Sequence, residues 1–193
     1  MEVIIHLILV LIKIAILGSI YATLALLTFK LIGRLRPNSW FDKVSKKKLR
    51  LWLVGGLLSS SALLIFMFTY WGNHGLGDGP QIPISNGEII TNTNWEDVCY
   101  LNLPNDKRQG FEIEKYFVIN NKLCGKIDTN SFYEYEYQFF IFDLITKKTQ
   151  EFKTENQYNL FAKTNGIITA DKLQRFRENY RSYWGGWRAW FLA

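Results

Sequence analysis

Two long apolar runs limit what this chain can fold into. The run from Val3 to Gly33 contains His6, Lys13 and Lys30 as its only residues of the Asp, Glu, Lys, Arg and His types, and the run from Leu51 to Trp71 contains none. Each run reaches the roughly 20 apolar residues that cross a bilayer core about 30 Å thick. Because two such runs lie close together, we expect two transmembrane helices rather than two buried helices of a soluble domain.

A cleaved signal peptide is the alternative for the first run. Such a peptide carries basic residues before its apolar core and a small-residue cleavage site after it. Here Glu2 precedes the core and a basic segment follows it. We therefore expect a retained transmembrane hairpin over residues 1–71, with helices at about 3–33 and 51–71 and a loop at 34–50.

The loop between the two runs, RLRPNSWFDKVSKKKLR from Arg34 to Arg50, holds seven basic residues and one acidic residue, Asp42; we call it the basic loop. Residues 1–71 carry nine Lys and Arg against two Asp and Glu, or +7, whereas residues 72–193 carry fourteen against fifteen, or −1. The net charge of +6 is therefore not spread over the C-terminal part, which argues against a nucleic-acid-binding domain.

Short loops rich in Lys and Arg stay in the cytoplasm. We therefore expect a protein of the bacterial cytoplasmic (inner) membrane, with both termini and residues 72–193 on the extracytoplasmic, periplasmic side. A second role for the loop is contact with membrane lipid, in which anionic head groups bind Lys46, Lys47, Lys48 and Arg50.

Small residues recur at four-residue spacing in both runs and indicate a close helix–helix seam, either within the hairpin or with another membrane protein. They are Ala15 with Ser19, Gly18 with Ala22, Gly55 with Ser59, and Gly56 with Ser60. Lys13 is the one charge well inside a run. It either extends toward Glu2 and His6 at the membrane surface or contacts a partner subunit.

Residues 72–80 form a glycine-rich juncture, and the rest of the chain is expected to be α+β. Residues 81–161 contain strand-like runs, in some of which apolar and polar side chains alternate, which predicts a small antiparallel β domain of five or six strands. We expect strands at Glu88–Thr91, Val98–Leu103, Phe111–Ile119, Lys122–Ile127, a run containing Tyr133, Tyr135 and Tyr137, and Thr149–Phe152, with a tight turn at Asn120 and Asn121.

The two cysteines, Cys99 and Cys124, fall on expected strands of the extracytoplasmic part. In an oxidising compartment they can pair and close a loop of about 25 residues, worth roughly 3 kcal/mol. Two buried free thiols are the alternative.

The C-terminal stretch TADKLQRFRENYRSYWGGWRAWFLA predicts an amphipathic helix over about residues 169–184 that begins at Thr169, followed by an aromatic tail. Aromatic rings beside guanidinium groups favour the membrane–water interface. We expect five residues of this stretch to contact the lipid interface or a partner: Arg181, Trp184, Trp187, Arg188 and Trp190. Packing of the helix on the sheet is the alternative.

No histidine follows His74, and no catalytic constellation, metal motif or cofactor-binding motif is evident in the β-rich part. We therefore expect no catalytic, cofactor-binding or metal residues and a non-enzymatic, membrane-anchored interaction module. Such a module is an accessory subunit or an immunity or defence-type envelope protein whose outer domain binds another membrane or envelope protein. An extracytoplasmic enzyme with an Asp, Glu and Tyr site is the alternative, and a membrane-bound sensor is a third.

Overall fold

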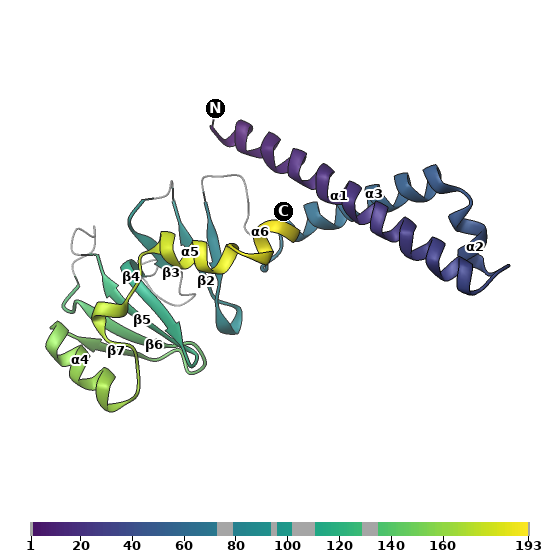
Figure 1. Ribbon diagram of the computed structural model, residues 1–193. Helices are drawn as coiled ribbons and strands as arrows, with labels where there is room; N and C mark the ends of the chain where they lie inside the picture. Colours follow the sequence, from purple (N-terminus) through teal and green to yellow (C-terminus); the bar gives the residue numbers. More distant parts are fainter. Residues whose placement is uncertain (1, 73–78, 94–95, 102–110, 129–134, 193) are drawn as a thin grey trace. The chain divides into compact units, whose positions relative to one another are not determined.

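The structure is a computed structural model that describes residues 2–72, 79–93, 96–101, 111–128 and 135–192 (Figure 1). The chain forms two compact units, of which one comprises Met1–Gly77 with Ala189–Ala193 and the other Asp78–Arg188. The first unit is helical, and the second contains a seven-stranded antiparallel sheet, so the protein is α+β.

The helical unit contains α1 (Glu2–Leu35), α2 (Trp40–Ser45) and α3 (Lys48–Met67). Its helices over Leu7–Leu35 and Lys48–Met67 are long and apolar enough to cross a membrane. Residues late in α1 lie beside residues early in α3, since the Trp52 Nε1 donates a hydrogen bond to the Thr23 Oγ1 at 3.1 Å while Ile14 and Leu17 cluster with Leu63. The two helices therefore pack antiparallel.

The sheet of the second unit is a simple meander in which every strand pairs with the next one along the chain. Its strands are β1 (Gln81–Pro83), β2 (Ile89–Asn92), β3 (Cys99–Leu101), β4 (Phe111–Ile119), β5 (Lys122–Ile127), β6 (Phe139–Asp143) and β7 (Thr149–Phe152). A short 3-10 turn, η1 (Ser85–Gly87), joins β1 to β2.

The expected β4–β5 turn is confirmed. Asn120 and Asn121 have φ angles of 49° and 58°, the left-handed conformation that a two-residue hairpin of this twist requires. Asparagine adopts this conformation at lower cost than most residues because its short polar side chain hydrogen-bonds locally. The sequence therefore specifies the register of the longest strand pair.

Two expectations for the β-rich part are wrong. Tyr135 and Tyr137 precede β6 and are not in a strand, while Tyr133 lies outside the described residues. The run at 155–161, expected within the β part, belongs instead to helix α4 (Glu155–Thr164). The Thr154 Oγ1 caps α4 by accepting a hydrogen bond from the Gln157 N–H at 3.4 Å.

Helix α4 packs on one face of the sheet, which we call the Cys124 face. Its buried members are Cys124, Phe139, Ile141 and Phe152 from the strands, with Tyr158 and Ala162 from α4 and Leu173 further along. The ring of Tyr158 stacks on Phe139 at 5.2 Å between centroids. The opposite face, the Cys99 face, carries residues that are also almost completely buried, among them Ile90, Leu101 and Phe140.

The C-terminal helix begins later than expected. A 3-10 turn, η2 (Ala170–Lys172), follows Thr169, and the α-helix α5 spans only Phe176–Trp184. Between them Gln174 pairs with Tyr116 of β4, with N–H to carbonyl distances of 2.8 and 3.1 Å in the two directions. The chain is extended there because these backbone groups are bonded to β4 rather than within a helix. A second short helix, α6 (Trp187–Phe191), follows.

Candidate functional site

Helix α5 presents three aromatic rings at four-residue spacing. Phe176 and Trp184 are buried and Tyr180 is half-buried, with ring centroids 5.7 and 6.4 Å apart along the series. The Trp184 Nε1 donates a hydrogen bond to the carbonyl oxygen of Gln81 in β1 at 2.8 Å. Trp184, for which a lipid or partner surface and packing on the sheet were the two alternatives, is buried in the β-rich unit, and its indole N–H is bonded inside that unit.

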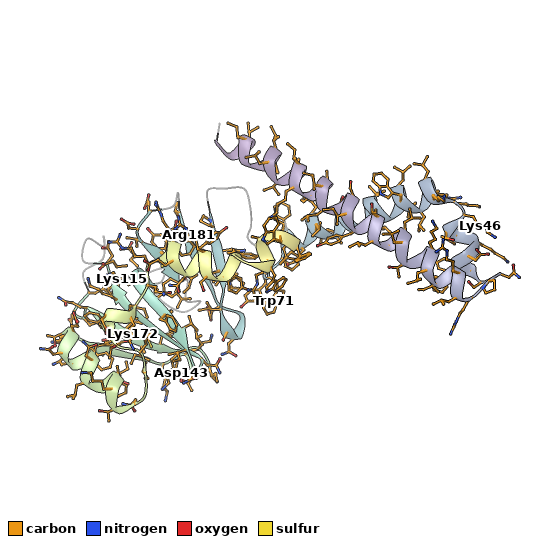
Figure 2. All side chains as sticks on the ribbon, viewed as in Figure 1. Lys46, Trp71, Lys115, Asp143, Lys172 and Arg181 are labelled. Carbon is orange, nitrogen blue, oxygen red and sulfur yellow. The ribbon has the colours of Figure 1, made fainter. Side chains whose placement is uncertain are left out.

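Two glycines end α5 and redirect the chain into α6. A β-carbon at Gly185 would collide with the carbonyl oxygen of Arg181, and Gly186 has a φ of 61°. Side chains other than glycine are strained in that conformation. Arg181 itself is exposed on α5, where Figure 2 shows its side chain.

The residues of α6 leave large aromatic surfaces open. Trp187, Trp190 and Phe191, which we call the aromatic tail, are 59%, 76% and 54% exposed. Single exposed apolar residues are ordinary, but three large rings within five residues mark a surface for another apolar phase or a partner. This tail is the first candidate interaction surface.

Arg188 is held in place beside the aromatic tail. Its guanidinium carbon lies 4.2 Å from the ring centroid of Tyr183 and 5.0 Å from that of Trp187, and its Nη1 donates to the carbonyl oxygen of Tyr183 at 3.0 Å. Stacked guanidinium groups keep free donors at their edges. Arg188 is thus ordered before any partner arrives. Tyr183 supports Arg188, a role that the sequence did not indicate.

The last residues of the chain group with the helical unit. Within that unit, the Tyr21 Oη of α1 donates a hydrogen bond to the carbonyl oxygen of Phe191 at 2.7 Å. The sequence carries no signal of this contact, since Tyr21 reads as an ordinary residue of an apolar run.

The basic loop is ordered around α2. The Ser39 Oγ accepts a hydrogen bond from the Asp42 N–H at 3.3 Å and caps the helix, and the Asp42 carboxylate pairs with the Lys46 Nζ at 2.9 Å. The hydrogen bond from Lys46 lowers the pKa of Asp42 below its ordinary value. Lys46 lies at the end of α2, where Figure 2 labels it.

Two aromatic residues of the basic loop form a cluster with a ring of α1. Phe29 of α1 contacts both Trp40 and Phe41 of α2, with ring centroids 5.6 and 5.2 Å apart. Trp40 is nevertheless 63% exposed. The adjacent aromatic residues Trp40 and Phe41 within the basic loop were the available signal for this cluster.

The remaining expected lipid contacts lie at the start of α3. Lys47 precedes the helix, and Lys48 and Arg50 lie in its first turn. All three are exposed, and among the described residues none of them forms an ion pair. With Lys46 they make the basic loop the second candidate interaction surface.

Lys13 lies half-buried on α1, next to the buried Ile14. Within the part of the chain that the structure describes, no carboxylate forms an ion pair with it. The side chains of Glu2 and His6, toward which it was expected to extend, are outside that part.

Of the two alternatives for Cys99 and Cys124, the structure has the buried free thiols and no disulfide. Cys99 pairs with Ile113, which in turn pairs with Ile127, so Cys99 and Ile127 share a face of the sheet. Cys124 lies three residues before Ile127 on β5, and an odd separation puts two strand residues on opposite faces. The sheet therefore separates the two thiols. The pairing was not predictable from two strand positions without their register.

Asn92 and Tyr116 are two buried polar residues of the β-rich unit. Asn92 donates to the carbonyl oxygens of Glu96 and Val98 at 2.9 and 2.6 Å and so shapes the β2–β3 connection. The Asn92 Oδ1 and the Tyr116 Oη have no hydrogen-bond partner among the described residues. No group of three or more His, Cys, Asp or Glu side chains that could hold a metal occurs in the described ranges.

Comparisons of the chain with models of protein families, with curated proteins and with solved structures find no match.

Proposed function

We propose that this chain is a membrane-anchored interaction module. In this proposal α1 and α3 cross the cytoplasmic membrane as a hairpin, the basic loop stays in the cytoplasm, and the β-rich unit lies outside, where it binds another protein. The aromatic tail forms its contact with the membrane surface or with that partner.

One observation carries the proposal: apolar side chains of α1 and α3 point outward. Leu57 and Ile65 of α3 are 70% and 67% exposed, and many further Leu, Ile and Val side chains of both helices are exposed as well. Exposed apolar patches of this extent are rare on soluble monomers and are covered by lipid in membrane proteins. The helix length agrees, since the 20 residues of α3 extend about 30 Å, the thickness of a bilayer core.

Charge supports the orientation. Every basic residue of the basic loop is exposed, and one carboxylate, Asp42, accompanies them. Translocation of seven cations in a short loop is disfavoured, which keeps that loop on the cytoplasmic side.

Two measurements test the anchoring and its orientation. Carbonate extraction of bacterial membranes should leave the full chain in the pellet. In a background with Cys99→Ser and Cys124→Ser, a cysteine introduced at exposed Asn156 should react with a membrane-impermeant thiol reagent in intact cells, whereas one at Arg36 should react only after lysis. Labelling of Arg36→Cys but not Asn156→Cys in intact cells would reverse the orientation.

The partner is tested by cross-linking in native membranes followed by mass spectrometry. A stoichiometric cross-linked protein is the expected result, and Trp187→Ala with Trp190→Ala should reduce its yield. The matched control is Leu160→Ala, which removes an equally exposed apolar side chain from α4. No cross-linked protein in the wild-type sample would contradict the partner-binding half of the proposal and leave the anchoring intact.

A further inference from the structure

We propose that the basic loop is a preformed binding surface for anionic phospholipid head groups, in which Trp40 enters the head-group layer beside Lys47, Lys48 and Arg50. This inference rests on the proposed membrane anchoring. It goes beyond the orientation rule, which needs positive charge in the loop but no particular arrangement of it.

The loop has a defined shape. A β-carbon at Gly33 would come within 2.9 Å of the Asp42 Cα, so α2 packs backbone against backbone on the end of α1. Ser39 caps the start of α2, and the Ser45 Oγ donates to the carbonyl oxygen of Asp42 at 2.9 Å at its end. A segment that served only to carry charge would not need these contacts.

The charges of the loop are left uncompensated by the protein. Asp42 is its single carboxylate, and it pairs with Lys46. Among the described residues, the other six cations of the loop form no ion pair; they are Arg34, Arg36, Lys43, Lys47, Lys48 and Arg50. An external anion is the complementary partner for such a surface, and anionic lipid is the anion present at the cytoplasmic face of a membrane.

The position of three cations argues for a role other than helix stability. Lys47 precedes α3 and Lys48 and Arg50 lie in its first turn, while no acidic residue occurs there. Cations at a helix N-terminus are disfavoured by the helix dipole. Head-group phosphates at this end of α3 would offset that repulsion.

Trp40 supplies the apolar part of the surface. Its ring rests on Phe29 and on Phe41, 5.6 and 5.3 Å away between centroids, yet 63% of the residue is exposed. Tryptophan is enriched at the head-group level because its ring is apolar and its N–H is polar. The ring contacts hold this side chain at the start of α2 with most of its surface exposed.

The test is native mass spectrometry of the full chain in detergent with added dioleoylphosphatidylglycerol or dioleoylphosphatidylcholine. The variant K47Q/K48Q/R50Q removes three charges from the surface, and K148Q/K153Q/K163Q removes three from exposed positions of the β-rich unit as the matched control. We expect the wild type and the control to retain the anionic lipid preferentially. The loop variant should bind it on the order of 100-fold more weakly, with unchanged binding of phosphatidylcholine.

Two further conditions make the result specific. Trp40→Ala should weaken retention of both lipids, because the ring contact does not depend on head-group charge, and 0.5 M salt should reduce the preference of the wild type by screening. Equal retention of phosphatidylglycerol by the loop variant and the control would overturn the inference. Carbonate extraction separates the two proposals. A wild type that stays in the membrane pellet but shows no more lipid preference than the loop variant contradicts this inference alone, and a wild type that is extracted contradicts both.

Discussion

Gly18 of α1 lies directly against Ser60 of α3. A β-carbon at Gly18 would collide with the Ser60 Oγ and come within 3.2 Å of the carbonyl oxygen of Gly56. The backbones of the two helices therefore approach each other closely, and dispersion contacts and local shape hold the pair together. Of the small residues expected to form this seam, Gly18 and Ala22 are buried in it, whereas Ala15 is exposed.

Replacement of Gly18 by leucine should separate α1 from α3. The added side chain overfills a packed contact, and overpacking costs typically 1–3 kcal/mol. We expect a lower midpoint of thermal unfolding for the full chain in detergent. Ala15→Leu, at the exposed position one turn away, is the matched control and should leave the midpoint unchanged; equal effects of both substitutions would argue against a specific seam.

The two tryptophans Trp184 and Trp190 should behave oppositely in stability measurements. Trp184→Phe removes the hydrogen bond to Gln81 and should cost about 1 kcal/mol, and Trp184→Ala should cost about 3–5 kcal/mol because it also leaves a cavity. Trp190→Ala should change the free energy of unfolding by less than about 0.5 kcal/mol, since its ring is exposed. Denaturant titration of the full chain measures all three. A strong loss of stability in Trp190→Ala would show that this ring is packed in solution.

The two cysteines should titrate as free thiols. The unreduced and reduced protein should migrate alike on a gel, and unfolding should release two reactive groups per chain. Burial raises the pKa of Cys124 to about 11, against 9.0 for the free side chain. The thiolate population of the folded protein is therefore small at pH 8, and a thiol reagent should react slowly before unfolding.

The raised pKa of Cys124 also makes the free energy of unfolding depend on pH. As pH rises past 9 the unfolded chain ionises Cys124 first, because the folded pKa is the higher one, so the free energy of unfolding should fall between pH 9 and about 11. Cys124→Ala should remove this part of the decline. An unreduced sample that migrates faster than a reduced one would contradict the free-thiol structure.

Local signals in the sequence were sufficient for several elements of the fold. Asn120 and Asn121 predict their turn because few other residues tolerate positive φ there, and the strands on either side follow from alternation. The small residues Gly18 and Ala22 predict a close helix contact because their four-residue spacing puts both on one helix face. Helix α4 was missed although its signals were present: Thr154 caps it, and Phe161 and Ala162 follow Tyr158 by three and four residues.

The remaining features depend on contacts between distant segments. The break before α5 arises because Gln174 bonds to Tyr116, 58 positions earlier in the chain, and no property of residues 169–176 shows this. The separation of Cys99 from Cys124 depends on strand register and on a bulge between Ile113 and Lys115. Likewise, Trp184 and Trp187 look alike in sequence, yet Trp184 is buried and bonds to the distant carbonyl of Gln81, whereas Trp187 is exposed.

The aromatic tail should lie within reach of lipid when the full chain is in a bilayer. In nanodiscs that contain brominated phospholipid, tryptophan fluorescence is quenched wherever a ring contacts the acyl chains. We expect Trp187→Phe with Trp190→Phe to lower the quenched fraction of the emission, because both rings are exposed on α6 and Arg188 is ordered beside them to meet a phosphate. Trp184→Phe is the matched control and should raise the quenched fraction, since it removes a buried ring that lipid does not reach. If the double variant changes the quenched fraction in the same direction as the control, the tail is shielded from lipid and its exposed rings serve a protein partner instead.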